Sequence, residues 1–534
     1  MKKTISSLFP AIVFLFLFSF DAPVQAQSVS SEKIDSLVEL TMKTFQVPGM
    51  AVAVIKDGTI THMKGYGVRS LNSKVKTNEH TLFGVASNTK AFTAAALGLL
   101  VEEGKISWDD KVVKHIPEFK LYNEYVTREF TIRDLLTHRS GLGLGAGDLM
   151  ISPDGGDFTI KDLLYNMQYL KPVSDFRTKF DYDNLLYIIA GEVVARVTNT
   201  SFQDFTEQRI LQPLGMTNSA ASFNRLKDTT NIIDAHAVID GKLKVIDRYR
   251  TPLLDAAGGI YTSVHDLSKW LIMLMNNGKY GDDLKKRLLS HNVIQEQWAP
   301  QTIIQYGGEN PFNTHFVAYG LGWFIADVKG YKQVSHTGGL PGMLTQVTMI
   351  PELNLGIIVL TNQQNGHAFQ AITNTIEQSY LPMEPVDWVK LNKEQEVKQN
   401  KQAKDYTDTI WKDVNAKLKE KKGKVDLDVY TGTFEDKWFG QIDIYKKKNK
   451  LYFRSKRSPN LNGEMLYYKD NTFVVKWTDR SMEADAFVKY SPDEEGNFTN
   501  ITMKAVSPLT DFSYDFHDLD FMKVEPQNTV SGSK

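Results

Sequence analysis

The sequence contains no cysteine among its 534 residues. This absence excludes disulfide bonds, thiol catalysis, cysteine-ligated metal sites and the N-terminal lipid anchor of bacterial lipoproteins. The formal net charge is −1 at pH 7, so there is no excess of positive charge that would favour binding to nucleic acid or to an anionic membrane. We therefore expect the function to depend on particular residues rather than on overall composition.

Long apolar runs are also scarce, and the one that stands out lies near the N-terminus. Lys2 and Lys3 precede an apolar stretch over residues 11–20, and a small-residue cleavage site ends at Ala26. This order is typical of a secretory signal peptide, here residues 1–26, and the apolar run is too short to span a bilayer comfortably. We expect a periplasmic or secreted protein with no transmembrane segment after signal removal, and an uncleaved membrane anchor is the alternative.

The pattern after the predicted signal peptide divides the chain into further regions. Residues 27–385 mix helical and strand patterns, with an early Asp-Gly hairpin signal and several short apolar runs near the end. This order predicts an α+β domain with one antiparallel sheet, whose strands come from both ends of the domain, and a helical subdomain between them.

The remainder of the chain is different in character. Residues 386–424 are rich in charge and predict a helical connector, with an unstructured linker as the alternative. Residues 425–526 contain short strands separated by turn signals, a pattern that favours a small antiparallel β-barrel or sandwich. We expect residues 527–534 to form a disordered tail.

Ser87 and Lys90 are the strongest candidates for chemistry. They open a long apolar helical run, and residues i and i+3 of a helix share a face, so the Lys90 amine is expected to reach the Ser87 hydroxyl. A serine hydroxyl needs such a neighbour to take its proton before it attacks a carbonyl carbon. The Ser-x-x-Lys pattern alone is weak, because it also begins at Ser30, Ser73 and Ser531, none of which opens an apolar helix.

A second motif, Tyr182-Asp183-Asn184, is the only Tyr-x-Asn in the sequence. It precedes an apolar helical stretch, and a loop in that position can present a phenol and an amide to a cleft. Ammonium charge nearby would lower the pKa of the phenol and make its phenolate a proton acceptor. The alternative is that Tyr182 and Asn184 form only a turn and a helix N-cap.

A third motif, His336-Thr337-Gly338-Gly339, lies at the end of a predicted strand. Paired glycines let a substrate approach the backbone closely, and an exposed strand edge can bind an extended peptide or acyl chain. The alternative is a Gly-rich turn between a strand and a loop.

The three motifs together, in this order, resemble the serine β-lactamase and penicillin-binding protein superfamily. Within it the pattern resembles the class C β-lactamase-like branch, which also contains D,D-carboxypeptidases, D-aminopeptidases and esterases. Supporting stretches lie at residues 81–83, 135–142, 213–216 and 256–261. The resemblance covers roughly residues 32–380, and the C-terminal region resembles the lipocalin-like tail domain that some of these hydrolases carry.

The resemblance implies a role for each candidate residue. Ser87 would be the acylated nucleophile, Lys90 would take or relay its proton, and Tyr182 would act as general base. The substrate-binding residues would be Asn184, His336, Thr337, Gly338 and Gly339, with the amides of Ser87 and Gly339 forming an oxyanion hole. Neither a cofactor nor a metal ion is implied.

His336 departs from the pattern of class C β-lactamases, in which this position is usually lysine. Histidine is mostly neutral at pH 7 and is less suited to a substrate carboxylate, which argues against efficient β-lactam hydrolysis. The sequence thus predicts an exported serine hydrolase that acts through an acyl-enzyme on D-amino-acid peptides, β-lactams or small esters. The alternative is a penicillin-binding or sensory protein that acylates without efficient turnover. No pattern indicates an oligomeric state.

His138 and the predicted barrel raise two further questions. His138 could complete a Ser-His-Asp triad, but its surroundings indicate helix packing, and Lys90 and Tyr182 already fill the role of base. The barrel could contact the catalytic cleft and restrict access to it, which we keep as a hypothesis.

Overall fold

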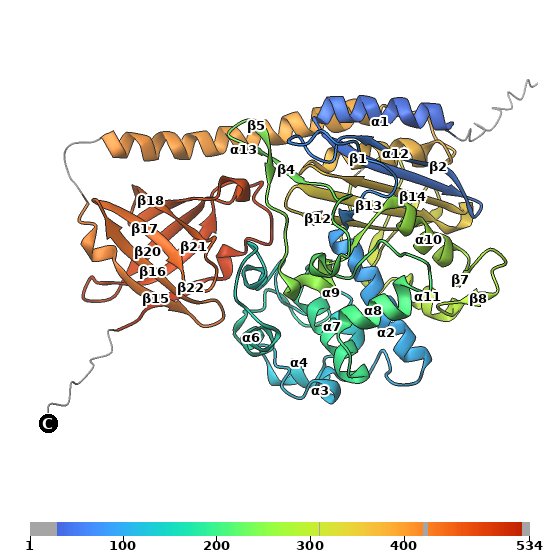
Figure 1. Cartoon of the computed structure of the whole chain (residues 1–534). Helices are drawn as coiled ribbons and strands as arrows, with labels where there is room; N and C mark the ends of the chain where they lie inside the picture. The colour runs from blue at the N-terminus through green and yellow to red at the C-terminus, as the bar shows by residue number, and fades with distance from the viewer. Residues whose placement is uncertain (1–28, 309, 420–424, 526–534) are drawn as a thin grey trace, which may run out of the picture.

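The computed structural model describes residues 29–308, 310–419 and 425–525. Figure 1 shows a mixed unit, in which helices flank a large sheet, and a β-barrel, with the long helix α13 (Trp388–Lys419) running from one to the other. The predicted signal peptide, the end of the predicted connector from residue 420 and the predicted tail lie outside the described residues. Within the described ranges, no helix is long and apolar enough to cross a membrane.

Within the described residues, the mixed unit is built on a sheet of eight antiparallel strands in the order β2-β1-β14-β13-β12-β11-β10-β9. These strands are β1 (Gly49–Lys56), β2 (Thr59–Gly67), β9 (Thr302–Ile304), β10 (Val317–Tyr319), β11 (Phe324–Val328), β12 (Tyr331–Leu340), β13 (Met343–Ile350) and β14 (Leu355–Thr361). Asp57 and Gly58 form the β1–β2 turn at φ 52° and 74°, the left-handed geometry that Asp-Gly favours in two-residue hairpins. This early hairpin joins the last strand, since Ala53 pairs with Ile358. The predicted sheet, and with it the α+β class, is confirmed.

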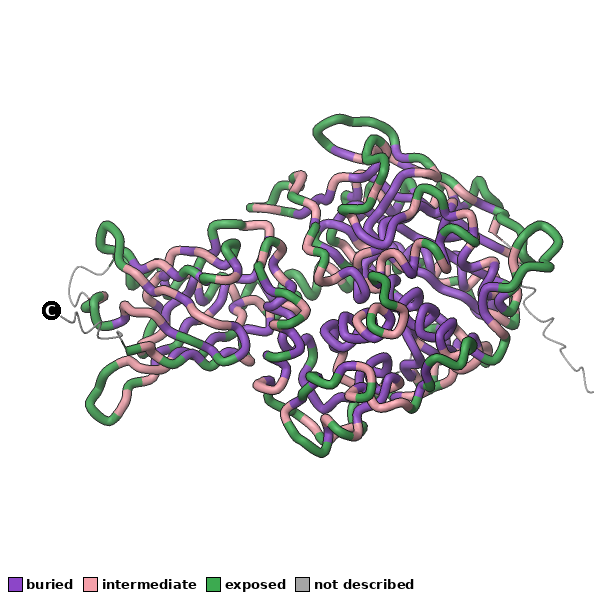
Figure 2. Tube along the Cα trace, turned by 60° about the horizontal axis from the view of Figure 1, so that its bottom comes forward, coloured by how far each residue is buried: buried purple, intermediate pink, exposed green. Residues whose placement is uncertain are grey.

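The central strands are buried on both faces because the sheet lies between two helical layers. The upper layer in Figure 1 contains α1 (Ser31–Phe45) and α12 (Gly366–Gln378), and the lower layer contains α2 (Thr89–Glu102) and α10 (Val264–Met275). Side chains of a strand alternate between the faces, so Val54 contacts the upper core and Ala53 the lower one. Figure 2 shows the buried residues concentrated in the interior of the molecule and the exposed residues mainly in its outer loops.

Helix α2 lies at the centre of the helical subdomain. Its residues from Thr89 to Leu100 are all buried, as expected for a helix that is apolar on every side and enclosed by protein. The helices around it and below it are α3 (Val112–His115), α4 (Glu124–Glu129), α5 (Ile132–Leu135), α6 (Ile160–Asn166), α7 (Leu185–Thr198), α8 (Phe202–Thr206), α9 (Asp255–Gly258) and α11 (His291–Gln297). Short strand pairs join these loops, namely β3 (Phe83–Gly84) with β6 (Tyr261–Thr262), β4 (Ala235–Ile239) with β5 (Lys242–Ile246), and β7 (Lys279–Tyr280) with β8 (Lys286–Arg287).

The described part of the C-terminal unit forms a closed antiparallel barrel of eight strands, which confirms the predicted barrel. Its strands are β15 (Gly432–Asp436), β16 (Gly440–Lys447), β17 (Lys450–Ser455), β18 (Asn462–Lys469), β19 (Thr472–Trp477), β20 (Ala486–Pro492), β21 (Phe498–Ala505) and β22 (Asp520–Lys523). Large buried rings such as Phe434, Phe453 and Trp477 belong to its core. Helix α13 packs on its outer wall through Ile410 and Val414.

Candidate active site

The candidate nucleophile lies in a tight turn at the start of α2. Ser87 belongs to a short 3-10 segment, Ala86–Asn88, that leads directly into the helix. Ala86 adopts φ 48°, a left-handed conformation that costs a non-glycine residue on the order of 1 kcal/mol and recurs at functional turns. Ser87 therefore lies just before the α-helix rather than within it, but Lys90 Nζ still donates to Ser87 Oγ at 3.0 Å, as the spacing predicted.

Lys90 is completely buried beneath Ser87. Besides Ser87 Oγ, its ammonium donates to Asn184 Oδ1 at 2.7 Å and to the carbonyl oxygen of Ala257 at 3.0 Å, which uses all three of its protons. Burial lowers the pKa of Lys90 to about 7, although the carboxyl groups of Asp148 and Asp183 act in the opposite direction. A large fraction of the amine is thus neutral near pH 7 and can accept a proton.

This lowered pKa predicts how acylation should depend on pH. The reactive form of Lys90 is the neutral amine, which increases as pH rises through about 7, so the acylation rate should rise roughly tenfold per unit below that pH and level off above it. The titratable groups around the ammonium are Asp148, Asp183, Tyr182, Tyr187, His138 and His336. The measurement is the second-order rate constant for labelling by an uncharged fluorophosphonate, taken from about pH 5 to about pH 9. A flat profile would contradict the role of Lys90 as base.

Asn184 is oriented by the capping of the next helix. Asp183, not Asn184, caps α7, since its Oδ1 accepts from the amides of Leu185 at 2.8 Å and Leu186 at 3.4 Å. The Asn184 side chain makes no capping bond and turns instead toward Lys90 and Asp148, whose Oδ2 accepts from Asn184 Nδ2 at 2.7 Å. The alternative that Asn184 serves only as a helix cap is therefore wrong.

Tyr182 lies beside the Ser87–Lys90 pair. Its ring centroid is 4.8 Å from Lys90 Nζ and 4.2 Å from the ring of His138. The ring retains some exposure, yet burial raises the pKa of the phenol well above its ordinary value, and the hydrogen bond with the Ser87 side chain lowers it only in part. The expectation of a lowered pKa for this phenol is thus wrong in direction, because loss of solvent, with smaller contributions from Tyr187 and Asp148, raises it.

The third motif lies on β12, directly against the nucleophile turn. A Cβ atom at Gly338 would lie 2.1 Å from the carbonyl oxygen of Val85 and 3.1 Å from Ala86 Cβ, so only glycine lets the strand approach this closely. Thr345 of β13 fixes the same contact by donating from Oγ1 to the Val85 carbonyl at 3.1 Å. Thr337 and Gly339 line the cavity in front of Ser87. The motif is therefore part of the cleft wall and not only a turn.

His336 is buried, with 2% of its surface exposed. Its Nε2 lies 2.9 Å from the Tyr319 hydroxyl and its Nδ1 lies 2.6 Å from the Thr337 carbonyl oxygen. Burial, and to a smaller extent the charge of Lys90, lowers the pKa of His336 to about 3. The expectation of a neutral side chain at this position is confirmed, and the position carries no fixed cation.

His138 does not form a triad with Ser87. Its Nδ1 accepts from the backbone amide of Asp183 at 3.1 Å, and its ring packs beneath Tyr182. Burial lowers its pKa well below the ordinary value, so it is neutral. His138 supports the loop that carries the second motif, in agreement with the packing role expected of it.

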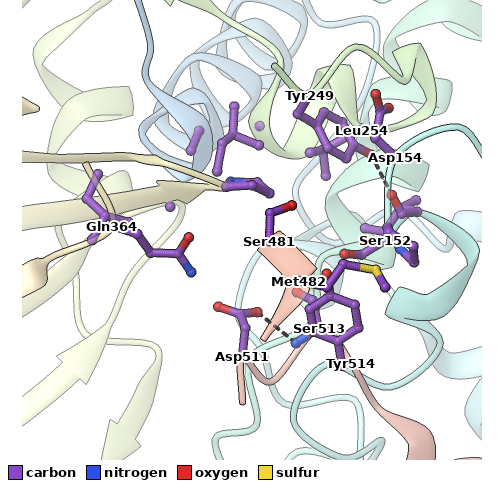
Figure 3. A pocket seen from close by; sticks show the side chains of 18 of the residues that line it. Ser152, Asp154, Tyr249, Leu254, Gln364, Ser481, Met482, Asp511, Ser513 and Tyr514 are labelled. Atoms are coloured by element: carbon purple, nitrogen blue, oxygen red, sulfur yellow. Dashed lines mark hydrogen bonds between the residues drawn. The ribbon is translucent and has the colours of Figure 1, made fainter. Parts of the chain in front are cut away.

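A cavity of about 800 Å³ opens in front of Ser87. Figure 3 shows side chains from both units meeting there, with Ser152 and Tyr249 from the mixed unit facing Met482 and Ser513 from the barrel. These barrel residues and Asp148 carry no signal in the sequence, because they belong to no motif and the loops that carry them are brought together only by the fold. Within the described residues, no group of three or more metal-ligating side chains is arranged to hold a metal ion.

The fold and this arrangement define a serine hydrolase-like site, and comparison with known proteins identifies the family. Residues 34–380 match the family model described as Beta-lactamase, so the chain belongs to the Beta-lactamase family, within the serine β-lactamase and penicillin-binding protein superfamily. Residues 417–523 match a domain described as a domain of unknown function, DUF3471.

Similar proteins include hydrolases and a penicillin-binding protein homologue. The chain is 27% identical over 437 residues to Unguisins hydrolase ungD' of Aspergillus campestris, covering 79% of each chain. It is 28% identical over 338 residues to Protein flp of Staphylococcus aureus, covering 62% of this chain and 63% of that protein, which is less than two thirds of its length. The octameric penicillin-binding protein homologue from Pyrococcus abyssi has the same fold, with a TM-score of 0.58 at 21% identity over 93% of this chain and 100% of that one.

Proposed function

We propose that this chain is an exported serine hydrolase that transfers an acyl group from substrate to Ser87 and then to water. The observation that carries the proposal is the buried contact between Ser87 Oγ and Lys90 Nζ, at 3.0 Å, beside Tyr182 and at the floor of the cavity. Hydrolases of the same family among its relatives support the class of reaction. The N-terminal sequence pattern supports export to the periplasm or the medium.

In the proposed reaction, neutral Lys90 takes the proton of the Ser87 hydroxyl as Oγ attacks the substrate carbonyl carbon. The oxyanion of the tetrahedral intermediate accepts hydrogen bonds from the amides of Ser87 and Gly339. Collapse of the intermediate breaks the bond to the leaving group, which receives the proton through Tyr182. Because the phenol stays protonated in the free protein, Tyr182 acts here as a proton relay and not as a phenolate base.

Water then completes the cycle. A water molecule gives up a proton to the same Lys90–Tyr182 pair and attacks the ester carbon, and Ser87 Oγ leaves with a proton. Asn184, oriented by Lys90 and Asp148, faces the cavity and would bind the amide or ester group of the acyl chain.

The surroundings of His336 favour substrates that place no carboxylate group against residues 336–339. The neutral imidazole supplies no fixed positive charge, and the cation at the cavity wall, Arg248, is already paired with Asp234. Hydrogen bonds to charged groups contribute about 1.5–3 kcal/mol, so a carboxylate that lacks such a partner loses roughly tenfold to a hundredfold in affinity. Small esters and D-amino amides are thus favoured over β-lactams and D-Ala-D-Ala peptides.

A substrate panel on one preparation tests this order. We expect kcat/KM for a p-nitrophenyl ester or a D-amino amide to exceed that for a nitrocefin-type lactam and for a D-Ala-D-Ala peptide by at least about tenfold. The lactam as the best substrate would contradict the argument from His336. An adduct with penicillin that persists for hours, without turnover of any of the four compounds, would instead identify a penicillin-binding or sensory protein.

A further inference from the structure

The loop between β21 and β22 of the barrel enters the mixed unit beside the candidate active site. Asp515 is fully buried there, and its carboxylate accepts from the backbone amides of Gly147 at 2.7 Å and Leu149 at 3.0 Å. The carbonyl of Phe512 packs so closely on Gly145 that a Cβ atom at that glycine would lie 2.7 Å from its oxygen. The loop is therefore fixed at its base by buried contacts with residues 145–149.

The same loop joins the hydrogen bonds that reach the nucleophile. Ser513 Oγ donates to Asp148 Oδ2 at 2.8 Å, and the same oxygen accepts from Asn184 Nδ2 at 2.7 Å. Asn184 Oδ1 in turn accepts from Lys90 Nζ, which donates to Ser87 Oγ. An uninterrupted series of four hydrogen bonds thus connects a barrel hydroxyl to the candidate nucleophile.

Phe512 of the same loop packs against Tyr182, which lies beside Ser87. Its ring meets the Tyr182 ring edge-on, with centroids 5.7 Å apart, and it remains 38% exposed. Figure 3 shows Asp511, Ser513 and Tyr514 of this loop in the pocket, with the amide of Ser513 bound to the Asp511 carboxylate. The loop thus reaches the site in two ways. Ser513 bonds to Asp148, which holds Asn184, and Phe512 contacts Tyr182 directly.

The core of the barrel is packed with large side chains. The core of the barrel is filled by aromatic rings, including Trp477 against Phe453 at 5.3 Å and Phe473 against Tyr430 at 4.9 Å. Rings at these distances are in direct contact, and packed interiors contain few voids larger than a water molecule. The residues of this unit that line the cleft instead belong to its outer loops, among them Met482 and residues 511–514.

We propose that the barrel is a structural component of the active site, with Ser513 as a positioning residue that holds Asp148 so that Asn184 keeps Lys90 in contact with Ser87. This role rests on the proposed acyl-enzyme function. Asp148 Oδ1 has no hydrogen-bond partner among the described residues, so the Oδ2 contacts with Ser513 and Asn184 are what hold the buried carboxyl group in place.

Loss of the Ser513 hydroxyl should change the charge of this carboxyl group. Burial and the nearby charge of Asp183 already raise the pKa of Asp148 to about 8, while hydrogen bonds from Asn184 and Ser513 lower it. The titratable groups that face Asp148 are Asp183, Asp515, Lys90, Tyr182 and Tyr249. Asp148 is already largely protonated near pH 7, so a further loss of ionisation removes only the remaining negative charge beside Lys90. The pKa of the lysine and the midpoint of the pH profile should therefore move slightly to lower pH.

The test compares Ser513→Ala, Ser513→Thr and Ser507→Ala in the full-length chain. Ser507 lies on the same loop, but its Oγ bonds only locally, to the amide of Leu509. For Ser513→Ala we expect acylation by a fluorophosphonate to slow about tenfold, the value of one lost hydrogen bond, with a lower pH midpoint. Ser513→Thr should restore most of the rate, and Ser507→Ala should match wild type.

The outcomes separate the two proposals. A Ser513→Ala protein that melts like wild type, is labelled at the wild-type rate and keeps the same pH profile would overturn the positioning role alone. Slower labelling with an unshifted midpoint and no rescue by threonine would also overturn it, because a general loosening of the cleft then explains the result. Wild-type protein that resists all serine-directed probes would overturn the acyl-enzyme function itself.

Discussion

A Ser87→Ala variant is expected to lose covalent labelling completely and to lose about 10⁴-fold or more in kcat/KM. The substitution removes only a hydroxyl whose partners are Lys90 Nζ and the Tyr182 side chain, and it leaves the backbone hydrogen bonds of the 3-10 turn intact. Removal of the attacking oxygen leaves no group that can form the ester intermediate, because the other atoms of the site only bind and transfer protons. Labelling by a fluorescent fluorophosphonate and turnover of the best ester measure the two effects.

Ser73→Ala is the matched control for this variant. Ser73 and Lys76 repeat the Ser-x-x-Lys spacing, but both are exposed and lie outside any helix. We expect this variant to be labelled and to turn over substrate like wild type. Residual labelling of Ser87→Ala above background, with a native melting curve, would place the nucleophile elsewhere.

A Lys90→Met variant is expected to lose about 10³-fold in the rate of acylation and to lose the pH dependence near 7. Methionine matches the length of the lysine stem but cannot accept the proton of Ser87, and it leaves Asn184 Oδ1 and the Ala257 carbonyl without their donor. Stability should change less than activity, because removal of a buried charge offsets part of the cost of these two unpaired oxygens. Stopped-flow labelling across the pH range and a urea unfolding curve measure the two quantities.

Lys76→Met provides the corresponding control, since the Lys76 side chain is exposed. It should leave rate, pH profile and stability unchanged. If Lys90→Met retained the rise of the rate through about pH 7, another group would be the base, and the Asp148–Asp183 cluster would be the next candidate.

The sequence predicted the fold well where short-range signals agree with the architecture. The Asp57-Gly58 turn encodes the β1–β2 hairpin locally, and the apolar run after Ser87 encodes a helix that protein surrounds. The order of elements was sufficient to infer a sheet shared between the two ends of the domain, because the first hairpin leaves one edge of β1 unpaired and a late strand pairs with it.

Only those residues of the candidate site that belong to a sequence motif could be predicted. The three motifs do come together around one cavity. It is lined by Ser87, Tyr182, Asn184, His336, Thr337 and Gly339, with Lys90 buried beneath Ser87 and Gly338 packed against the nucleophile turn. The pKa of Tyr182 was expected in the wrong direction, because a sequence shows neighbouring charge but not the amount of water that folding removes.

Asp148, Phe512 and Ser513 carried no local signal. Their contacts join segments more than 300 residues apart, as in the Ser513–Asp148 hydrogen bond, where the separation is 365 residues. Such a contact depends on how the barrel docks on the mixed unit, which no spacing within either unit specifies.

The most direct test of the account is the location of the covalent adduct. Wild-type protein is treated with a fluorophosphonate, digested and analysed by tandem mass spectrometry, with intact-mass measurement for stoichiometry. The account predicts a single adduct per chain, on Ser87, whose formation is lost in Lys90→Met at neutral pH on the time scale of wild-type labelling. An adduct on another serine, or ester turnover by a protein that forms no adduct at Ser87, would contradict it.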